Sequence, residues 1–353
     1  MSNIIIHERP GVYSSYDAST IIRGGRAVRV IGVAAKATAG TPNVPVTLTS
    51  YEGGLSAFGE DAEGTPGMAA ILSLLFQNGA STVVAVAVEE EDYTTAFAAL
   101  NGVDNIQVIV CDSGDETVQQ ALRSSLEEAS ATRRERIAVV GMSGAGTTEL
   151  TERAEALNSE RMVLVGPDVL DQAGKALSGI FAAAAVAGAI ATTADPAIPL
   201  NGTPLKGLGG VSTLYNDNEI DLLVRGGVTP LEAVGGVVSP VRGITTRTTT
   251  GGVQDITWRE LTTILIVDDV IPSIRASLRS RFSRTKNTAQ TRGAIRSQVI
   301  VELENKLRAE IIDSYGEVEV SVYEDDPTVC LVEFSFAVAH GLNQIYLTAH
   351  ITI

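Results

Sequence analysis

The sequence predicts a mixed fold, in which an α/β region with a mainly parallel sheet is followed by an α+β unit. Two observations predict it: short apolar runs alternate with helical segments between residues 83 and 167, and the last third of the chain groups helical repeats beside β-rich runs. The chain has 353 residues, of which 44% are hydrophobic and 19% charged. This size and composition favour two domains with separate cores and argue against disorder.

The α/β region rests on a regular alternation of strands and helices. The expected strands are residues 83–88, 106–112, 136–142 and 161–167. The expected helices are residues 93–101, 116–131 and 147–158. Continuous apolar strands separated by helices are typical of a parallel sheet that is covered on both faces. The stretch 176–194 has the length of a membrane span, but it is mostly alanine, which contributes little transfer free energy, so we expect a buried helix.

The rest of the chain is irregular at first and then regular again. Loops rich in glycine and proline begin near residue 195, and we interpret them as connections between domains or between edge strands. Residues 254–270 are strand-like. Apolar residues then repeat at helical spacing in two sets, Ile271, Ile274, Leu278 and Phe282, followed by Ile295, Val299, Leu303, Leu307 and Ile311. Three β runs, 318–323, 329–338 and 343–353, complete a unit of one strand, two helices and three strands.

A glycine-rich turn raises the question of nucleotide binding. In VVGMSGAGTT (139–148), Gly141 and Gly146 have the G-x-x-x-x-G spacing of a phosphate-binding loop, but Thr147 stands where that loop has its lysine. The pattern around Ser143 also lacks the last glycine of a nucleophile elbow. Both motifs are therefore incomplete.

We interpret this turn as a tight strand-to-helix connection. Thr147 or Thr148 is expected to cap the helix, with Glu149 or Glu152 in its first turn. The competing hypothesis is an α/β enzyme or nucleotide-binding protein that uses the 141–148 turn.

The acidic turn CDSGDET (111–117) has two readings as well. Asp112 and Asp115 follow a predicted strand, where carboxylates can hold a metal ion. Capping of the next helix by Asp112 or Ser113, with Asp115 and Glu116 favoured by the helix dipole, accounts for the same residues. We favour the capping interpretation.

Histidines and cysteines give no recognisable site. His7, His340 and His350 are too few and too scattered for a zinc site of the usual spacings. Cys111 and Cys330 lie in apolar runs and have the character of reduced, packed thiols. We therefore expect no catalytic residue, no metal and no other cofactor.

The charge distribution is uneven. A formal net charge of −16 argues against a general nucleic-acid binder, and the N-terminal residues lack the pattern of a cleaved export signal. One block nevertheless contains cationic residues and no carboxylate. It comprises Arg275, Arg279, Arg281, Arg284, Lys286, Arg292 and Arg296. This block is either a surface for an acidic protein partner or a solvated helix face.

Both chain ends have β character. Residues 343–353 form a run of strand-compatible residues without a polar tail, and residues 3–16 are β-like apart from Pro10 and Gly11. Terminal segments fray unless they are tied into a sheet. The two ends either pair within their own subunit or add strands to a neighbouring copy.

Several stretches, taken in order, resemble the contractile tail sheath proteins of phages and phage-tail-like bacteriocins. They are RPGVY (9–13), the segments 58–88, 191–211 and 240–250, the run WRELTTILIVDDVIPSIRASLRSRF (258–282), and the segment 311–353. Each is a pattern of glycine, proline and apolar residues, and the ordered set spans nearly the whole chain. The resemblance implies a structural protein and not an enzyme.

The resemblance also implies an assembly. Subunits of this family polymerise as stacked hexameric rings around an inner tail tube and contract to drive that tube through a target cell envelope. The implied partners are further copies, the tube protein, and the baseplate and tail terminator proteins, with no direct contact to nucleic acid or membrane. The implied location is a virion tail or phage-tail-like particle that is assembled in the bacterial cytoplasm.

Carried onto this sequence, the resemblance implies a domain plan and two kinds of contact residue. The plan has an N-terminal arm and first inner strand (1–28), an inserted outer α/β domain (29–240), an inner α+β domain (241–342) and a C-terminal arm (343–353). The cationic block becomes a candidate surface facing the tube or a neighbour. The arm residues are Arg9, Pro10, Gly11, Val12, Tyr13, Asn343, Gln344, Ile345, Tyr346, Leu347, Thr348, Ala349, His350, Ile351, Thr352 and Ile353.

Overall fold

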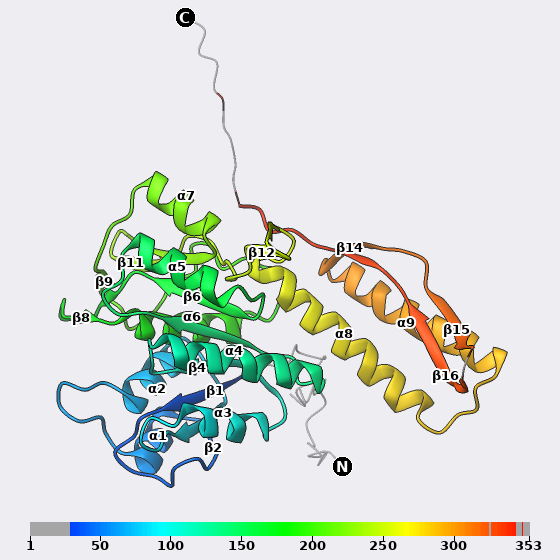
Figure 1. Cartoon of the computed structure of the whole chain (residues 1–353), viewed down its shortest axis with the longest axis horizontal. Coiled ribbons are helices and arrows are strands. Elements are labelled where there is room, and N and C mark those ends of the chain that lie inside the picture. The colour runs from blue at the N-terminus through cyan, green and yellow to red at the C-terminus, as the bar shows by residue number, and fades with distance from the viewer. Residues whose placement is uncertain (1–28, 325, 344–347, 349–353) are drawn as a thin grey trace, which may run out of the picture.

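The structure is a computed structural model that describes residues 29–324, 326–343 and 348 (Figure 1). Its centre is an eight-stranded sheet in the order β11-β10-β6-β5-β4-β1-β3-β2. All neighbours pair in parallel except β2 with β3 and β10 with β11. The strands are β1 (Val30–Ala35), β2 (Val46–Leu48), β3 (Val83–Ala87), β4 (Ile106–Cys111), β5 (Ile137–Gly141), β6 (Met162–Gly166), β10 (Val228–Val234) and β11 (Val237–Pro240).

Helices cover both faces of this sheet, as the alternation predicts. They are α1 (Tyr51–Phe58), α2 (Met68–Gln77), α3 (Tyr93–Asn101), α4 (Glu116–Ala131), α5 (Thr147–Leu157), α6 (Gly179–Thr192) and α7 (Asp217–Arg225). Successive residues of a strand point to opposite faces, so the sheet contributes to two cores. One core packs against α2 and α6, and the other packs against α3, α4 and α5.

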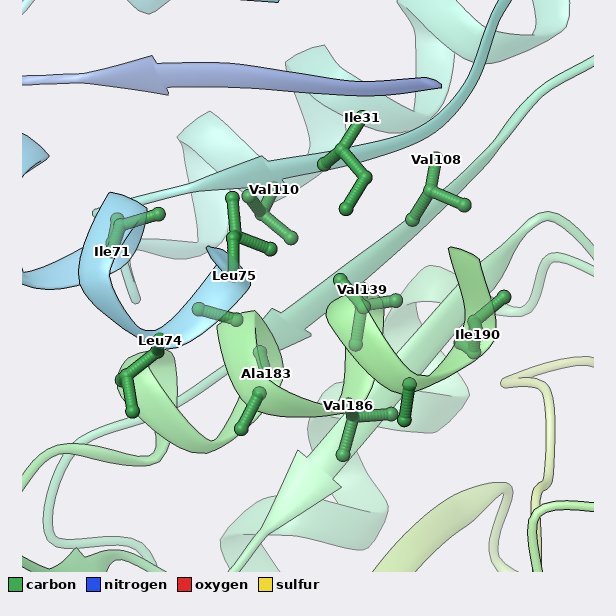
Figure 2. Packing of buried hydrophobic residues seen from close by; sticks show 14 of the residues in the cluster. Ile31, Ile71, Leu74, Leu75, Val108, Val110, Val139, Ala183, Val186 and Ile190 are labelled. Atoms are coloured by element: carbon green, nitrogen blue, oxygen red, sulfur yellow. The ribbon is translucent and has the colours of Figure 1, made fainter. Parts of the chain in front are cut away.

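The alanine-rich helix α6 lies across the first of these faces. Figure 2 shows Val108 and Val139 of the sheet in the same cluster as Ala183 and Val186 of α6. Small side chains let a helix approach the sheet closely, and every residue from Phe181 to Ala191 is buried. The expected buried helix is confirmed. Among the described residues, no helix is both long and apolar enough to cross a bilayer.

The four predicted strands and three predicted helices are confirmed, but the central strand β1 was missed. It lies between β4 and β3 and is buried along almost its whole length. The alternation of apolar runs and helical segments that predicted the other strands begins at residue 83 and does not include β1. The loops after residue 195 also contain more structure than expected, namely α7 and the β10–β11 hairpin. Gly235 and Gly236 close that hairpin with φ of 60° and 82°, the left-handed region that a two-residue turn requires.

The C-terminal part is an α+β unit built on two long helices. It contains α8 (Leu261–Phe282), α9 (Ala289–Arg308), β14 (Ile312–Tyr315), β15 (Glu319–Tyr323), β16 (Asp326–Glu333) and β17 (Phe336–Val338). Figure 1 shows α8 leaving the α/β body and α9 returning beside it. Among the residues that the structure describes, β14 pairs only with β17 and β15 only with β16, in two separate antiparallel ladders. Shorter strands are β7 (Val169–Leu170), β8 (Ala176–Leu177), β9 (Gly210–Val211), β12 (Thr249–Thr250) and β13 (Val253–Gln254).

The expected strand over 254–270 is wrong, because α8 begins at Leu261. The β-branched residues of this segment favour a strand locally. Their helical spacing, however, lets side chains of one helix be buried in two different cores. Leu261 and Ile264 pack into the α/β core, whereas Ile266 and Val270 pack into the core of the C-terminal unit. Burial at helical spacing outweighs a β-propensity difference of about 1 kcal/mol or less per residue.

Candidate functional site

A backbone N–H group of the glycine-rich turn binds a carboxylate of the same chain, that of Asp168. The backbone N–H of Gly144 donates to Asp168 Oδ2 at 2.7 Å, and the N–H of Gly179 donates to Asp168 Oδ1 at 2.6 Å. A phosphate-binding turn would direct such donors at a ligand. Here they hold the α6 N-terminus against the turn.

Gly141 allows the N-terminus of α6 to pack closely against this turn. A Cβ placed on Gly141 would lie 2.2 Å from both the backbone C and O of Gly179. The expected caps Thr147 and Thr148 are wrong, because the helix N-cap is Gly146, whose N–H donates to Glu149 at 3.1 Å. The expected acidic first turn at Glu149 is confirmed.

The acidic turn after β4 makes structural contacts. Asp112 accepts hydrogen bonds from Tyr93 Oη at 2.6 Å and from the Lys36 N–H at 2.8 Å. Burial raises the pKa of Asp112, and these hydrogen bonds offset part of the increase. The helix cap is Asp115, which accepts from the Thr117 N–H at 2.7 Å, so the expected caps Asp112 and Ser113 are wrong. Within the described ranges, no group of three or more His, Cys, Asp or Glu side chains is placed to hold a metal.

Among the described residues, His340 and the two cysteines belong to no group that could hold a metal ion. His340 is exposed, and His7 and His350 lie outside the described residues. Both cysteines are free thiols. Burial raises the pKa of Cys111 to about 12, which makes it a poor nucleophile.

The cationic block separates into two surfaces. Arg275 and Arg279 face a groove between α8 and the α/β body. Arg281, Arg284 and Lys286 lie at the far end of the α8–α9 hairpin (Figure 1), where all three are exposed and, within the described residues, make no ion pair. We call these three residues the hairpin tip.

The last two members of the block are engaged on α9. Arg292 donates to Asn287 Oδ1 at 3.0 Å. Arg296 donates to the Val318 carbonyl at 2.8 Å and pairs with Glu317 at 3.2 Å. Both therefore hold the hairpin against its own loops.

The groove beside α8, which we call the junction groove, has a volume of about 1420 Å³. Its walls come from α8 and from the loops that precede β1, β4 and β5. The arginines that line it are Arg29, Arg133, Arg134, Arg136, Arg275 and Arg279.

Arg136 is the most unusual of these arginines, because its side chain is only 1% exposed and makes no ion pair among the described residues. It donates to the carbonyls of Leu100 and Val103, both at 3.2 Å, and to Asn101 Oδ1 at 3.1 Å. These acceptors lie at the C-terminal end of α3, where the helix dipole favours a cation. Burial lowers the pKa of Arg136 to about 10, so the residue remains charged near neutral pH.

Each carboxylate of the groove already has a cation. The most buried pair joins Arg161 to both oxygens of Asp268, at 2.8 and 3.0 Å, and connects the body to α8. Burial raises the pKa of Asp268, and Arg161 opposes that effect. The remaining pairs are Glu135 with Arg275 at 2.8 Å, Asp269 with Lys306 at 2.6 Å and Asp104 with Arg134 at 3.0 Å.

Sequence reasoning missed the arginines of the body that line this groove. A usable signal was present in TRRER (132–136), where two arginines stand just before a predicted strand and a third, Arg136, is its first residue. They lie far in sequence from Arg275 and Arg279, and only the packing of α8 on the body brings the two sets together.

The arm residues lie outside the described residues, except Asn343 and Thr348. Asn343 is exposed, and its Oδ1 accepts a hydrogen bond from Asn201 Nδ2 at 2.7 Å. The hairpin β15–β16 and the pair β14–β17 have backbone edges that no other described strand covers. Strand edges of this kind are templates for further pairing.

Comparison with known proteins identifies the family. A model of the phage tail sheath protein central domain matches residues 87–246, and a model of the phage tail sheath C-terminal domain matches residues 253–352. The chain belongs to the phage tail sheath family. That family is structural and not enzymatic, so the enzyme hypothesis has no support.

Curated relatives of this sheath protein agree with the assignment. It is 29% identical to the tail sheath protein of Bacillus phage SP01 over 252 residues, which cover 70% of this chain and 43% of that protein. It is 25% identical to the tail sheath protein of Mycobacterium phage Bxz1 over 300 residues, which cover 77% of this chain and 49% of that protein. The chain thus spans less than half the length of these relatives.

Solved structures share its fold from end to end. The helical sheath of the anti-feeding prophage in the contracted state matches with a TM-score of 0.74 at 18% identity, over 98% of this chain and 99% of that one. The sheath tail protein of Desulfitobacterium hafniense matches with a TM-score of 0.71 at 12% identity, over 93% and 100%. The mixed α/β fold of this sheath protein is therefore a sheath fold.

Proposed function

We propose that this sheath protein is the repeating subunit of a contractile tail. It polymerises as stacked hexameric rings around an inner tail tube and contracts to drive that tube through a target cell envelope. The observation that carries the proposal is the ordered match of two sheath-family domains along a chain whose whole fold is shared with a contracted sheath.

The arms supply the links between subunits in this proposal. The segments Arg9–Tyr13 and 343–353 add strands to the uncovered edges of a neighbour's C-terminal unit. A two-stranded ribbon is only marginally stable alone, so an added strand stabilises both the acceptor and the link. The proposed inner domain, 241–342, contains these acceptor edges, and the proposed outer domain, 29–240, contains the large sheet.

Contraction needs no nucleotide hydrolysis in this proposal. Free energy is stored when subunits are locked into an extended lattice and is released as rings rotate and repack. The proposed partners are other copies, the tube protein, and the baseplate and terminator proteins. The proposed location is a virion tail or phage-tail-like particle that is assembled in the bacterial cytoplasm.

Electron microscopy of the purified protein, alone and with its cognate tube protein, tests the proposal. Striated hollow cylinders are the expected result. A protein that stays monomeric under both conditions, while remaining folded by circular dichroism, would overturn it.

The hairpin tip is the proposed tube contact. Reversing Arg284 and Lys286 to glutamate should weaken co-sedimentation with the tube protein by about tenfold or more, because exposed cations that meet an acidic partner become repulsive. The matched control reverses Lys175 and Lys206, which are exposed, lie outside both cationic surfaces and change the net charge equally. If the tip variant and the control bind the tube protein equally well, the tip has no such role.

A further inference from the structure

We propose that the junction groove receives the acidic loop Glu89–Asp92 of a second copy, so that the α/β bodies of adjacent subunits join head to tail. The inference rests on the proposed function only in requiring that copies assemble. It assigns a contact between bodies, independent of the terminal arms.

The charges that line the junction groove favour an anionic occupant. Its four carboxylates are all neutralised by arginine or lysine, as described above. Arg133 and Arg279 are exposed on its walls and make no ion pair within the described residues. The groove therefore carries a local excess of positive charge in a chain whose formal net charge is −16. A second copy of the same acidic chain satisfies this requirement.

The loops at the two ends of the central sheet carry opposite net charge. Its registers pair Val30 with Ile106 at one end, and Ala35 with Ala87 at the other. Loops that enter the strands at the first end carry five arginines, Arg29, Arg133, Arg134, Arg136 and Arg161, against three carboxylates, Asp104, Glu135 and Glu160. Loops that leave the strands at the second end carry Glu89, Glu90, Glu91, Asp92, Asp112 and Asp115 against one cation, Lys36, and Glu116 begins α4.

The loop after β3 presents its carboxylates to solvent. All four of its acidic residues are exposed. Glu91 pairs with Lys36 at 2.6 Å, and Asp92 caps α3 by accepting from the Thr95 N–H at 3.1 Å. Glu89 and Glu90 make no ion pair with any described residue. Glu91 and Asp92 thus fix the loop. Glu89 accepts one hydrogen bond, from Asn43 Nδ2 at 3.4 Å, and its exposed carboxylate and that of Glu90 can still meet a partner.

The positions of groove and loop determine the kind of contact. They lie at opposite ends of one sheet, so a copy that donates its loop still has an empty groove for the next copy. Such a head-to-tail contact is heterologous, and its repetition gives a closed ring or an open helix. Both outcomes suit an assembly of stacked rings.

A charge swap tests the contact in the full-length protein. The groove variant carries Arg133→Glu and Arg279→Glu, and the loop variant carries Glu89→Arg and Glu90→Arg. Each should raise the protein concentration required for assembly by about tenfold or more, because attraction becomes repulsion at several sites. The combined variant should return most of the way to wild type. Light scattering and electron microscopy give the readout, and the Lys175→Glu, Lys206→Glu variant is the control.

The outcomes separate this inference from the proposed function. If the wild-type protein forms no cylinders, the proposed function fails first. If the wild type assembles and the groove variant, folded by circular dichroism, assembles equally well, the groove contact alone is overturned. If the groove variant fails but the loop variant assembles normally, or the combined variant is not rescued, the occupant is another segment or another protein, and the proposal is overturned as well.

Discussion

Removal of residues 344–353 is expected to leave a folded chain that no longer polymerises. An arm that adds a strand to a neighbour makes roughly 5 to 10 backbone hydrogen bonds, each contributing about 1 kcal/mol net. Their loss removes on the order of 5 to 10 kcal/mol from each contact, enough to prevent assembly at micromolar concentrations. Cutting after Asn343 preserves its hydrogen bond with Asn201. Analytical ultracentrifugation and electron microscopy measure the result.

A point variant separates backbone pairing from side-chain contacts in the arm. Leu347→Pro removes one backbone donor and fixes φ, whereas Leu347→Ala removes a larger apolar side chain and keeps the donor. Strand addition predicts that the proline variant assembles much more weakly than the alanine variant. Normal cylinders from the truncated protein would show that the arm does not link subunits.

Replacement of Gly141 by alanine is expected to lower the free energy of unfolding by about 3 kcal/mol or more. The added Cβ would lie 2.2 Å from the C and O atoms of Gly179 and 2.6 Å from the N atom of Ile180. These are backbone atoms, and Asp168 holds the Gly179 N–H at 2.6 Å, so they cannot move aside cheaply. Urea denaturation followed by circular dichroism measures the change.

The matched control is Gly293→Ala in α9. No atom lies within 4 Å of the Cβ it would add, and alanine is the better helix former. The control should raise the free energy of unfolding by about 0.5 to 1 kcal/mol. Equal stabilities of the two variants would contradict the close packing of β5 against α6.

Much of the α/β body was predictable because its signals are local. Residues 108–111 and 162–165, inside the predicted strands 106–112 and 161–167, are apolar without interruption, and the helices between them begin and end at composition changes. The family resemblance rests on the order of such local patterns, and the family models confirm it. The boundaries of domains and the roles of the arms and the hairpin tip remain predictions.

Errors arose where a distant contact determines the local structure. Residues 261–270 have strand propensity and form a helix, because Leu261 and Ile266 must reach two different cores. The cap of α5 is Gly146, whereas threonines were expected, because the turn is shaped by Asp168 and by the approach of Gly179.

The amino-acid sequence by itself determined the strands β3, β4, β5 and β6 and the helices α3, α4 and α5 between them, since burial on one or two faces leaves a period in the order of residues. Only the tertiary structure decided that β1 lies in the middle of the sheet and that arginines from residues 29, 133–136 and 275–279 surround one groove. Strand order and the convergence of charges depend on contacts between residues far apart in the chain, and these leave no periodic trace.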